Sequence, residues 1–154
     1  MAAAPIRAAD PADATAIARL LHDFNAEFDA PTPPVETLAA RCEELLRVGA
    51  MTVLLTGEPP VGLSLLRLRP SPWTDGEEAY LQELYVVPAR RGEGLGRALV
   101  EATIETARAA GAQSLDLNTG ETDVGARALY EKLGFTNREG GPDAPRMLFY
   151  EREI

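Results

Sequence analysis

Apolar residues recur at helical spacing in the first third of the chain, which predicts amphipathic helices. They are Ile17, Leu20, Leu21, Phe24 and Phe28, then Leu38, Cys42, Leu45 and Leu46. Asp10 and Pro11 offer an N-cap and a first helical residue, and prolines within residues 31–34 interrupt the pattern. We expect a short strand at 6–8, a helix over 11–28 and a second helix that ends at Gly49.

After residue 50 the pattern changes to short, branched, apolar runs, which are typical of strands. Residues 51–55 and 61–68 flank the turn Gly57-Glu58-Pro59-Pro60, and a third run at 79–87 stops at Pro88. The stretch from 69 to 76 contains prolines and Asp75-Gly76, which favour a loop. Three strands joined by short connections are expected to be antiparallel.

Helical and strand patterns alternate in the rest of the chain. A helix from Leu95 to Gly111 precedes a strand at 114–118, a helix at 125–133 follows, and residues 135–138 and 146–152 form a closing strand pair. The strand–helix–strand unit over 79–118 predicts a parallel crossover. The fold class is therefore α/β (α+β), a mixed and mostly antiparallel sheet of about six to seven strands with about four helices, in a single domain over residues 1–154.

Composition narrows the classes of function. The chain has 154 residues and a net charge of −9, which argues against sequence-independent nucleic-acid binding. No apolar run is long enough to span a membrane, and no secretory signal starts the sequence, so a cytoplasmic protein is expected. The single cysteine, Cys42, is expected to pack in the core, and with one histidine no metal site is predicted.

The most informative stretch is the glycine turn Arg91-Gly92-Glu93-Gly94-Leu95-Gly96-Arg97, where a strand gives way to a helix. The first turn of a helix has backbone N–H groups without internal partners, and the helix dipole adds positive charge at that end. Glycines allow the main chain to approach an anion closely, and Arg90 adds a third guanidinium beside those of the turn. The turn therefore predicts a phosphate or diphosphate site.

Other interpretations of this turn exist. A P-loop requires a lysine after its last glycine, and the only lysine is Lys132. A dinucleotide fingerprint begins with Gly92 and Gly94, but Arg97 stands in place of its third glycine, although Asp116 lies about twenty residues on. The turn could also serve only to redirect the chain.

Two motifs resemble those of the GNAT superfamily of N-acetyltransferases. Arg91-x-x-Gly94-x-Gly96, after Val86-Val87-Pro88, is similar to its acetyl-CoA signature. The stretch from Ala126 to Phe135, with Leu129-Tyr130 at its centre, is similar to its second signature. The order of elements also matches, so the resemblance covers nearly the whole chain from residue 6.

The resemblance implies acetyl-CoA as cosubstrate, with no metal. Its diphosphate would be held by Arg91, Gly92, Glu93, Gly94, Leu95, Gly96 and Arg97. Its pantetheine arm would lie between the splayed strands 79–87 and 114–118 and pair with the backbone of Leu84, Tyr85 and Val86. Further cofactor contacts are expected from Asn118, Asp123 (where the family often has asparagine) and Tyr130.

The same resemblance implies direct transfer of an acetyl group, in a ternary complex, to a primary amine of a small molecule or peptide. Tyr130 is our candidate acid, since a phenol is protonated at neutral pH; the alternative is a packing role. Glu83 is the candidate base, directly or through a water, unless it pairs with an arginine. Tyr80 and Glu78 are further candidates.

Side chains outside the motifs carry weaker signals. His22 is expected at the edge of a helix face, exposed to solvent, while Trp73 either lines the acceptor pocket or caps the core. Acidic residues near the expected acceptor site favour a cationic amine. They are Glu27, Asp29, Asp75, Glu77 and Glu78.

Two other classes of function remain open, as does the assembly. The chain could be an acyl-CoA-binding sensor without catalysis, or a dinucleotide-dependent oxidoreductase that uses the same turn. The family resemblance also implies that a homodimer is one expected assembly.

Overall fold

The computed structural model describes residues 4–154. The chain up to Leu117 forms one compact unit, and the chain from Asn118 forms another. The first three residues of the predicted single domain lie outside the described part, and the single domain itself stays a prediction.

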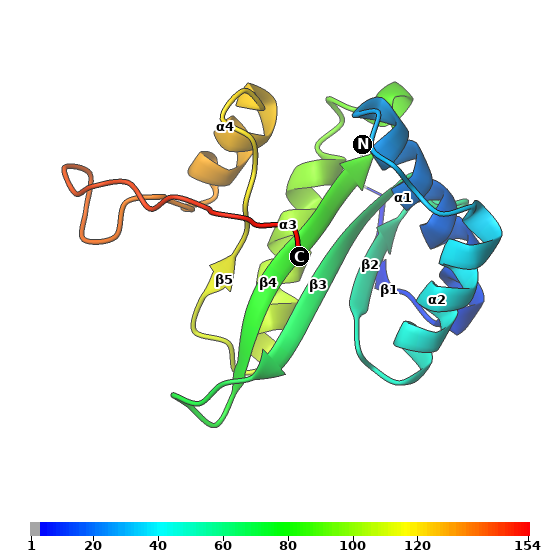
Figure 1. The fold of residues 1–154 in the computed structure, drawn as a ribbon, viewed down its shortest axis with the longest axis horizontal. Helices are drawn as coiled ribbons and strands as arrows, with labels where there is room; N and C mark the ends of the chain where they lie inside the picture. The colour runs from blue at the N-terminus through cyan, green and yellow to red at the C-terminus, as the bar shows by residue number, and fades with distance from the viewer. Residues whose placement is uncertain (1–3) are drawn as a thin grey trace. The chain divides into compact units, whose positions relative to one another are not determined.

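A five-stranded sheet in the order β1-β2-β3-β4-β5 is the centre of the first unit (Figure 1). Its strands are β1 (Ile6–Ala8), β2 (Thr52–Thr56), β3 (Gly62–Pro70), β4 (Glu77–Val86) and β5 (Leu115–Asp116). Neighbours from β1 to β4 are antiparallel, and β4 and β5 are parallel. The mixed, mostly antiparallel sheet and its parallel crossover are therefore confirmed.

The expected six to seven strands are wrong, because the described chain has five. The closing pair at 135–138 and 146–152 is reduced to one bridge between Arg138 and Arg146. Gly140 and Gly141 between them have φ values of 96° and 115°, and Pro142 has no N–H to donate. This connection forms an open loop rather than a tight hairpin turn, and the ladder does not extend beyond the bridge.

Helices cover both faces of this sheet (Figure 1). α1 (Ala14–Glu27) and α2 (Val35–Arg47) lie on one face, and α3 (Leu95–Ala109) lies on the other. A 3-10 turn, η1 (Pro11–Asp13), precedes α1, and the side chain of Asp10 accepts a hydrogen bond from Ala12 N–H at 2.8 Å. The predicted N-cap at Asp10 is thus confirmed.

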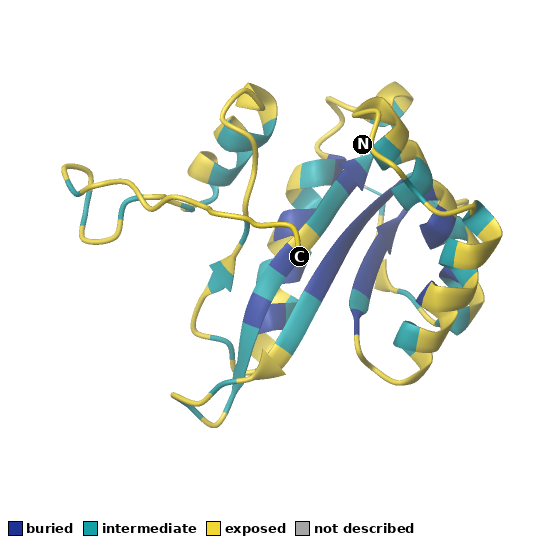
Figure 2. Ribbon diagram, viewed as in Figure 1, coloured by how far each residue is buried: buried dark blue, intermediate teal, exposed yellow. Residues whose placement is uncertain are grey.

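The core lies between β2, β3 and the first two helices (Figure 2). Alternate strand residues share one face, and those directed at α1 and α2 are Val53, Leu55, Leu63 and Leu65. Cys42 of α2 is buried among them, as predicted. On the opposite face the hydroxyls of Ser64 and Thr103 are 2.7 Å apart, which ties β3 to α3.

β4 contains a bulge that sets the direction of the side chains after it. Leu65 pairs with Glu83 and Leu66 pairs with Leu81, so Gln82 is an extra residue with no partner in the backbone register of β3. The extra residue returns Glu83 to the face that packs α1 and α2, the face that Tyr80 also occupies.

The second unit contains α4 (Val124–Lys132) and the loop that follows it. The side chain of Asp123 accepts a hydrogen bond from Ala126 N–H at 3.2 Å and so caps this helix. Within residues 4–154 no helix is long and apolar enough to cross a membrane.

Candidate active site

The glycine turn connects β4 to α3 through a short 3-10 turn, η2 (Pro88–Arg90). Gly92 and Gly94 have φ values of 82° and 81°, in the left-handed region, which any side chain makes unfavourable. A Cβ at either position would meet no atom within 4 Å. The need for glycine is therefore conformational, and space is left on the outer side of the turn for a ligand.

The backbone amides of this turn are available. Among residues 4–154, none accepts a hydrogen bond from the N–H groups of residues 92–97, and the first amide to donate is that of Ala98, to Gly94 O at 3.0 Å. Residues 92–94 and Arg97 are exposed. Free amides at a helix N-terminus, next to left-handed glycines, form an anion site. The residues present thus fit a diphosphate.

The arginines of the turn are held by carboxylates. Arg90 pairs with Glu93 at 2.7 Å, and Arg97 pairs with Glu101 at 2.9 Å. Because these pairs are partly exposed, they hold the side chains only weakly. In this state the backbone amides, rather than free guanidinium groups, provide most of the positive potential on the turn.

Arg91 is bound more extensively than the other two. Its Nη2 donates to both carboxylate oxygens of Glu27 at 2.8 and 3.0 Å, and its Nε donates to Val86 O at 2.9 Å. Tyr85 Oη also donates to Glu27, at 3.0 Å. Burial and then Glu27 raise the pKa of Tyr85 to about 12. Glu27 therefore ties the end of α1 to the glycine turn.

Sequence reasoning missed this arrangement. It placed Glu27 with the acceptor acids, whereas the carboxylate binds Arg91, which is 64 residues away in the chain. Neither residue lies in a motif that pairs them, so the sequence contains no signal for the contact.

One edge of β4 is open next to the turn. β5 pairs only with Ala79 and Tyr80, and the two strands then part. Val87 N–H donates to Val61 O at 2.9 Å, so by the alternation of an antiparallel ladder the backbone groups of Leu84 and Val86 point to the other edge. This edge can accept an extended, amide-containing ligand as an added strand.

Glu83 lies on the face of β4 that packs α1 and α2 and is half-buried. Burial raises its pKa above the ordinary value of 4.5. Within the described chain no arginine forms an ion pair with it, so the alternative of a structural pair is excluded for these residues. Tyr80 lies on the same face of β4, and burial and then the charge of Glu83 raise its pKa.

Tyr130 lies half-buried on α4, in the second unit. Its ring packs edge-on against Phe135, with centroids 5.7 Å apart. Burial and then the charge of Asp123 raise its pKa to about 12, so the phenol is protonated at neutral pH. The position of Asp123 as the cap of α4 explains why its carboxylate acts on this ring. Asn118, also in this unit, is exposed.

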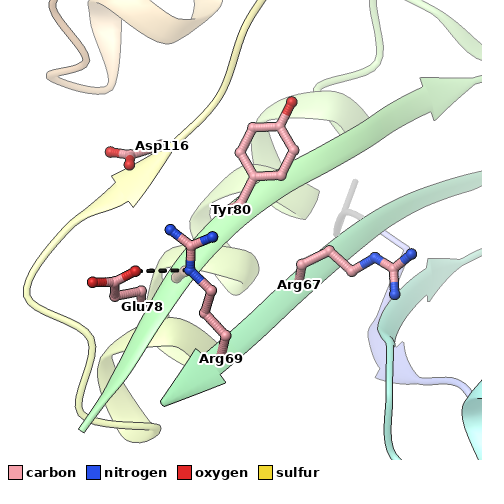
Figure 3. Close-up of a pocket in the computed structure, with 6 residues that line it drawn as sticks. Arg67, Arg69, Glu78, Tyr80 and Asp116 are labelled. Carbon is pink, nitrogen blue, oxygen red and sulfur yellow. Dashed lines mark hydrogen bonds and ion pairs between the residues drawn. The ribbon is translucent and has the colours of Figure 1, made fainter. Parts of the chain in front are cut away.

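A polar hollow of about 340 Å³ lies on the first unit's sheet (Figure 3). It is lined by Arg67, Arg69, Glu78, Ala79, Tyr80 and Asp116. Sequence reasoning named Tyr80 and Glu78 as candidates but missed the arginines. Two arginines separated by one residue on a strand share a face, and that spacing was the available signal.

The remaining candidates are simpler. Trp73 is 86% exposed and does not cap the core. His22 is partly buried rather than fully exposed. No group of three or more metal-ligating side chains occurs in the part of the chain that the structure describes.

Comparison with known proteins gives a consistent result. The profile of the Acetyltransferase (GNAT) family matches residues 16–135. An aminoglycoside N(6')-acetyltransferase type 1 from Stenotrophomonas maltophilia is 33% identical over 145 residues, with 90% of this chain and 91% of that protein covered. The crystal structure of an acetyltransferase candidate from Arthrobacter sp. FB24 is 46% identical, with a TM-score of 0.91, and covers 100% of this chain and 98% of its own.

Another relative matches over a shorter part. An IAA acetyltransferase from Azospirillum brasilense is 39% identical over 85 residues. This match covers 53% of the present chain and 55% of that protein, so the chain spans about half the length of this relative.

Proposed function

The chain belongs to the GNAT family of acetyltransferases, and we propose that it moves an acetyl group from acetyl-CoA to a primary amine of a small molecule or peptide, by direct transfer in a ternary complex. The observation that supports this most is the set of unpartnered amides at residues 92–97, in a turn whose residues 92–94 and Arg97 are exposed, beside the open edge of β4.

In this proposal the amides of residues 92–97 bind the diphosphate. Arg91 and Arg97 lie on the turn, paired with Glu27 and Glu101. The pantetheine arm is proposed to run along β4 from Leu84 through Tyr85 to Val86, and the backbone groups of Leu84 and Val86 lie on the open edge. Asn118, Asp123 and Tyr130 complete the cofactor contacts, by resemblance. Acetyl-CoA, when bound, supplies an acetyl group activated as a thioester.

Glu83 is proposed to take the proton from the attacking amine, directly or through a water. A carboxylate with a raised pKa is a stronger base than an ordinary one, and it needs no metal. Tyr130 Oη is proposed to hold a proton that it gives to the departing thiolate. Its raised pKa keeps that proton in place at neutral pH.

The acceptor is proposed to be a cation in solution, as amines are at neutral pH. The relative from Stenotrophomonas maltophilia is named for acetylation of aminoglycosides, which supports a small-molecule amine. The cationic acceptor was also predicted from five acidic residues near the expected acceptor site. Two of them are now less available to an amine, because Glu27 binds Arg91 and Glu78 binds Arg69.

The test is Tyr130→Phe, measured by thiol release from acetyl-CoA and by calorimetric binding of acetyl-CoA. We expect kcat to fall by about 10²–10³-fold, with acetyl-CoA affinity changed less than about threefold. Tyr150→Phe is the matched control, because Tyr150 is 83% exposed. Thiol release by neither wild type nor variant, with tight acetyl-CoA binding in both, would instead identify a sensor, and preference for NAD in the same titration would identify an oxidoreductase.

The proposal includes a homodimer in the cytoplasm. Met147, Leu148 and Phe149 are each at least 50% exposed, and an apolar segment of this kind is typical of an association surface. Light scattering on the purified chain is expected to give about twice the 16.5 kDa chain mass, and a mass that stays at one chain up to high protein concentration would remove the dimer from the proposal.

A further inference from the structure

The hollow in Figure 3 is a continuation of the face that packs α1 and α2. Arg67 and Arg69 follow Leu65 on alternate positions of β3, and Tyr80 and Glu78 are their partners across β4. Asp116 is the partner of Tyr80 on β5. Polar side chains thus replace the apolar ones of the core at this end of the sheet.

One cation of the hollow is already neutralised. Arg69 Nε lies 2.7 Å from Glu78 Oε2, so these two charges compensate each other. Figure 3 shows the pair where β3 ends and β4 begins. It adds polarity and a fixed wall to the hollow, but little net charge.

Arg67 is held in place without being neutralised. Its Nε donates to Gln82 Oε1 at 2.8 Å and its Nη1 donates to Ala50 O at 2.9 Å. Both acceptors are uncharged, and no carboxylate in residues 4–154 forms an ion pair with this guanidinium. Gln82 is the bulge residue of β4, so the bulge also fixes the orientation of this arginine.

A carboxylate without a cation lies on the other side of Tyr80 from Arg67 (Figure 3). Asp116 forms no ion pair within the described chain and lies on the edge strand β5. The register Arg67–Tyr80–Asp116 crosses three neighbouring strands, which spaces β3 and β5 about 10 Å apart. The hollow therefore presents an uncompensated positive charge on one side of Tyr80 and an uncompensated negative charge on the other.

We propose that the hollow is the acceptor site and that it selects a zwitterion, a small amine that also carries a carboxylate or a phosphate. Arg67 binds the acidic group, because a guanidinium fork matches both anions. Asp116 attracts the ammonium toward β5, next to the point where β4 and β5 part. A polyamine fits less well, because its second ammonium would face Arg67.

This inference depends on the proposed function, in that the selected amine is the one acetylated. It narrows the cationic acceptor of that proposal to one with a compensating acid. Glu83 lies on the same face, three residues after Tyr80 and across the bulge, where it can act on the bound amine.

The test uses acceptors in matched pairs, an amino sugar with and without its phosphate and an amino acid with and without amidation of its carboxylate. In the thiol-release assay, we expect kcat/KM for at least one acid-bearing member to exceed that of its neutral partner by about tenfold or more. The pair that shows the preference distinguishes phosphate from carboxylate. Equal values, within about twofold, in both pairs would overturn the proposal.

Variants link the preference to the residue. Arg67→Gln is expected to raise KM for the acid-bearing acceptor about tenfold and to leave KM of the neutral partner within about twofold. Arg67→Lys keeps the charge and is expected to restore part of the preference. Arg41→Gln is the control, because Arg41 is an exposed residue of α2 that pairs with Glu44; it should change the KM of neither acceptor. A preference that survives in Arg67→Gln contradicts the assignment.

Direct binding separates this inference from the proposed function. Calorimetry of each pair on the wild-type chain with CoA present needs no turnover. Tighter binding of the acid-bearing member that depends on Arg67, without acetyl transfer, would support the hollow as a zwitterion site and refute the proposed acetyl transfer. If neither acid-bearing compound binds, the hollow is not a zwitterion site, whatever the activity of the chain toward other amines.

Discussion

At the scale of single residues, Glu83 has the most unusual environment. Its neighbours on β4 are mainly apolar, it is half-buried, and its pKa is raised by burial. The folded chain therefore binds this proton more tightly than the unfolded chain does. As pH rises from the ordinary value of 4.5 through the folded pKa, the ionised carboxylate makes the fold less stable.

Glu83→Gln is expected to separate activity from stability. We expect kcat/KM to fall by about 10²–10⁴-fold, since the base is lost, and the acidic limb of the pH–rate profile assigned to Glu83 to disappear. The melting temperature is expected to rise at pH 7 and to match wild type near pH 4. The measurements are a pH–rate profile and thermal unfolding at both pH values. Retention of the same acidic limb in the variant would show that another group is the base.

Some residue roles follow from sequence and others do not. Glu83 stands out in the sequence as a carboxylate within an apolar strand, and Cys42 stands out as part of a helix face; burial of both agrees. The pairing of Glu27 with Arg91, and the lack of an ion-pair partner for Arg67 and Asp116 in the described chain, depend on which strands and helices pack together. A single sequence does not show which elements pack together.

At the scale of elements, the glycine turn and the open edge of β4 define the site. The turn is shaped by left-handed glycines and leaves the amides of α3's first turn unpaired. The bulge at Gln82 and the short pairing of β5 leave the adjacent strand edge open. Both features are properties of the backbone, so changes to backbone preference should affect them most.

Gly94→Ala tests the importance of the backbone conformation of the turn by adding a single Cβ atom. The left-handed φ of 81° disfavours a side chain by about 1–2 kcal/mol, so we expect a lower melting temperature and acetyl-CoA affinity reduced by about tenfold or more. Gly125→Ala is the control, because that glycine lies within α4, has no positive φ, and a Cβ added there would meet no atom within 4 Å. Calorimetry and thermal unfolding measure both. Unchanged acetyl-CoA affinity in Gly94→Ala would show that the turn does not bind the cofactor.

Most elements were predictable because their signals are local. The spacing of apolar residues predicted α1, α2 and α3 to within a few residues, and Pro88 marked the end of β4. β5 has two residues and is shorter than the expected strand at 114–118. The length of a strand depends on its pairing partner, and β4 pairs with β5 at only two positions. The closing pair failed for the same reason, since its apolar residues indicate strand character but not a partner.

At the scale of the whole molecule, an acidic chain has to bind an anionic cosubstrate. The net charge is −9, and the three arginines around the turn are paired with carboxylates. Attraction must therefore come from a local field, and the free amides of residues 92–97 with the dipole of α3 provide one. Family membership is established by the match over residues 16–135, whereas the chemistry depends on this local field.

Amide hydrogen exchange with and without saturating acetyl-CoA tests that field most directly. The account predicts slower exchange at residues 92–97 and at Leu84 and Val86, with no change in α2, which is distant in sequence and packs on the core. Saturated binding that leaves the exchange of residues 92–97 unchanged would contradict it.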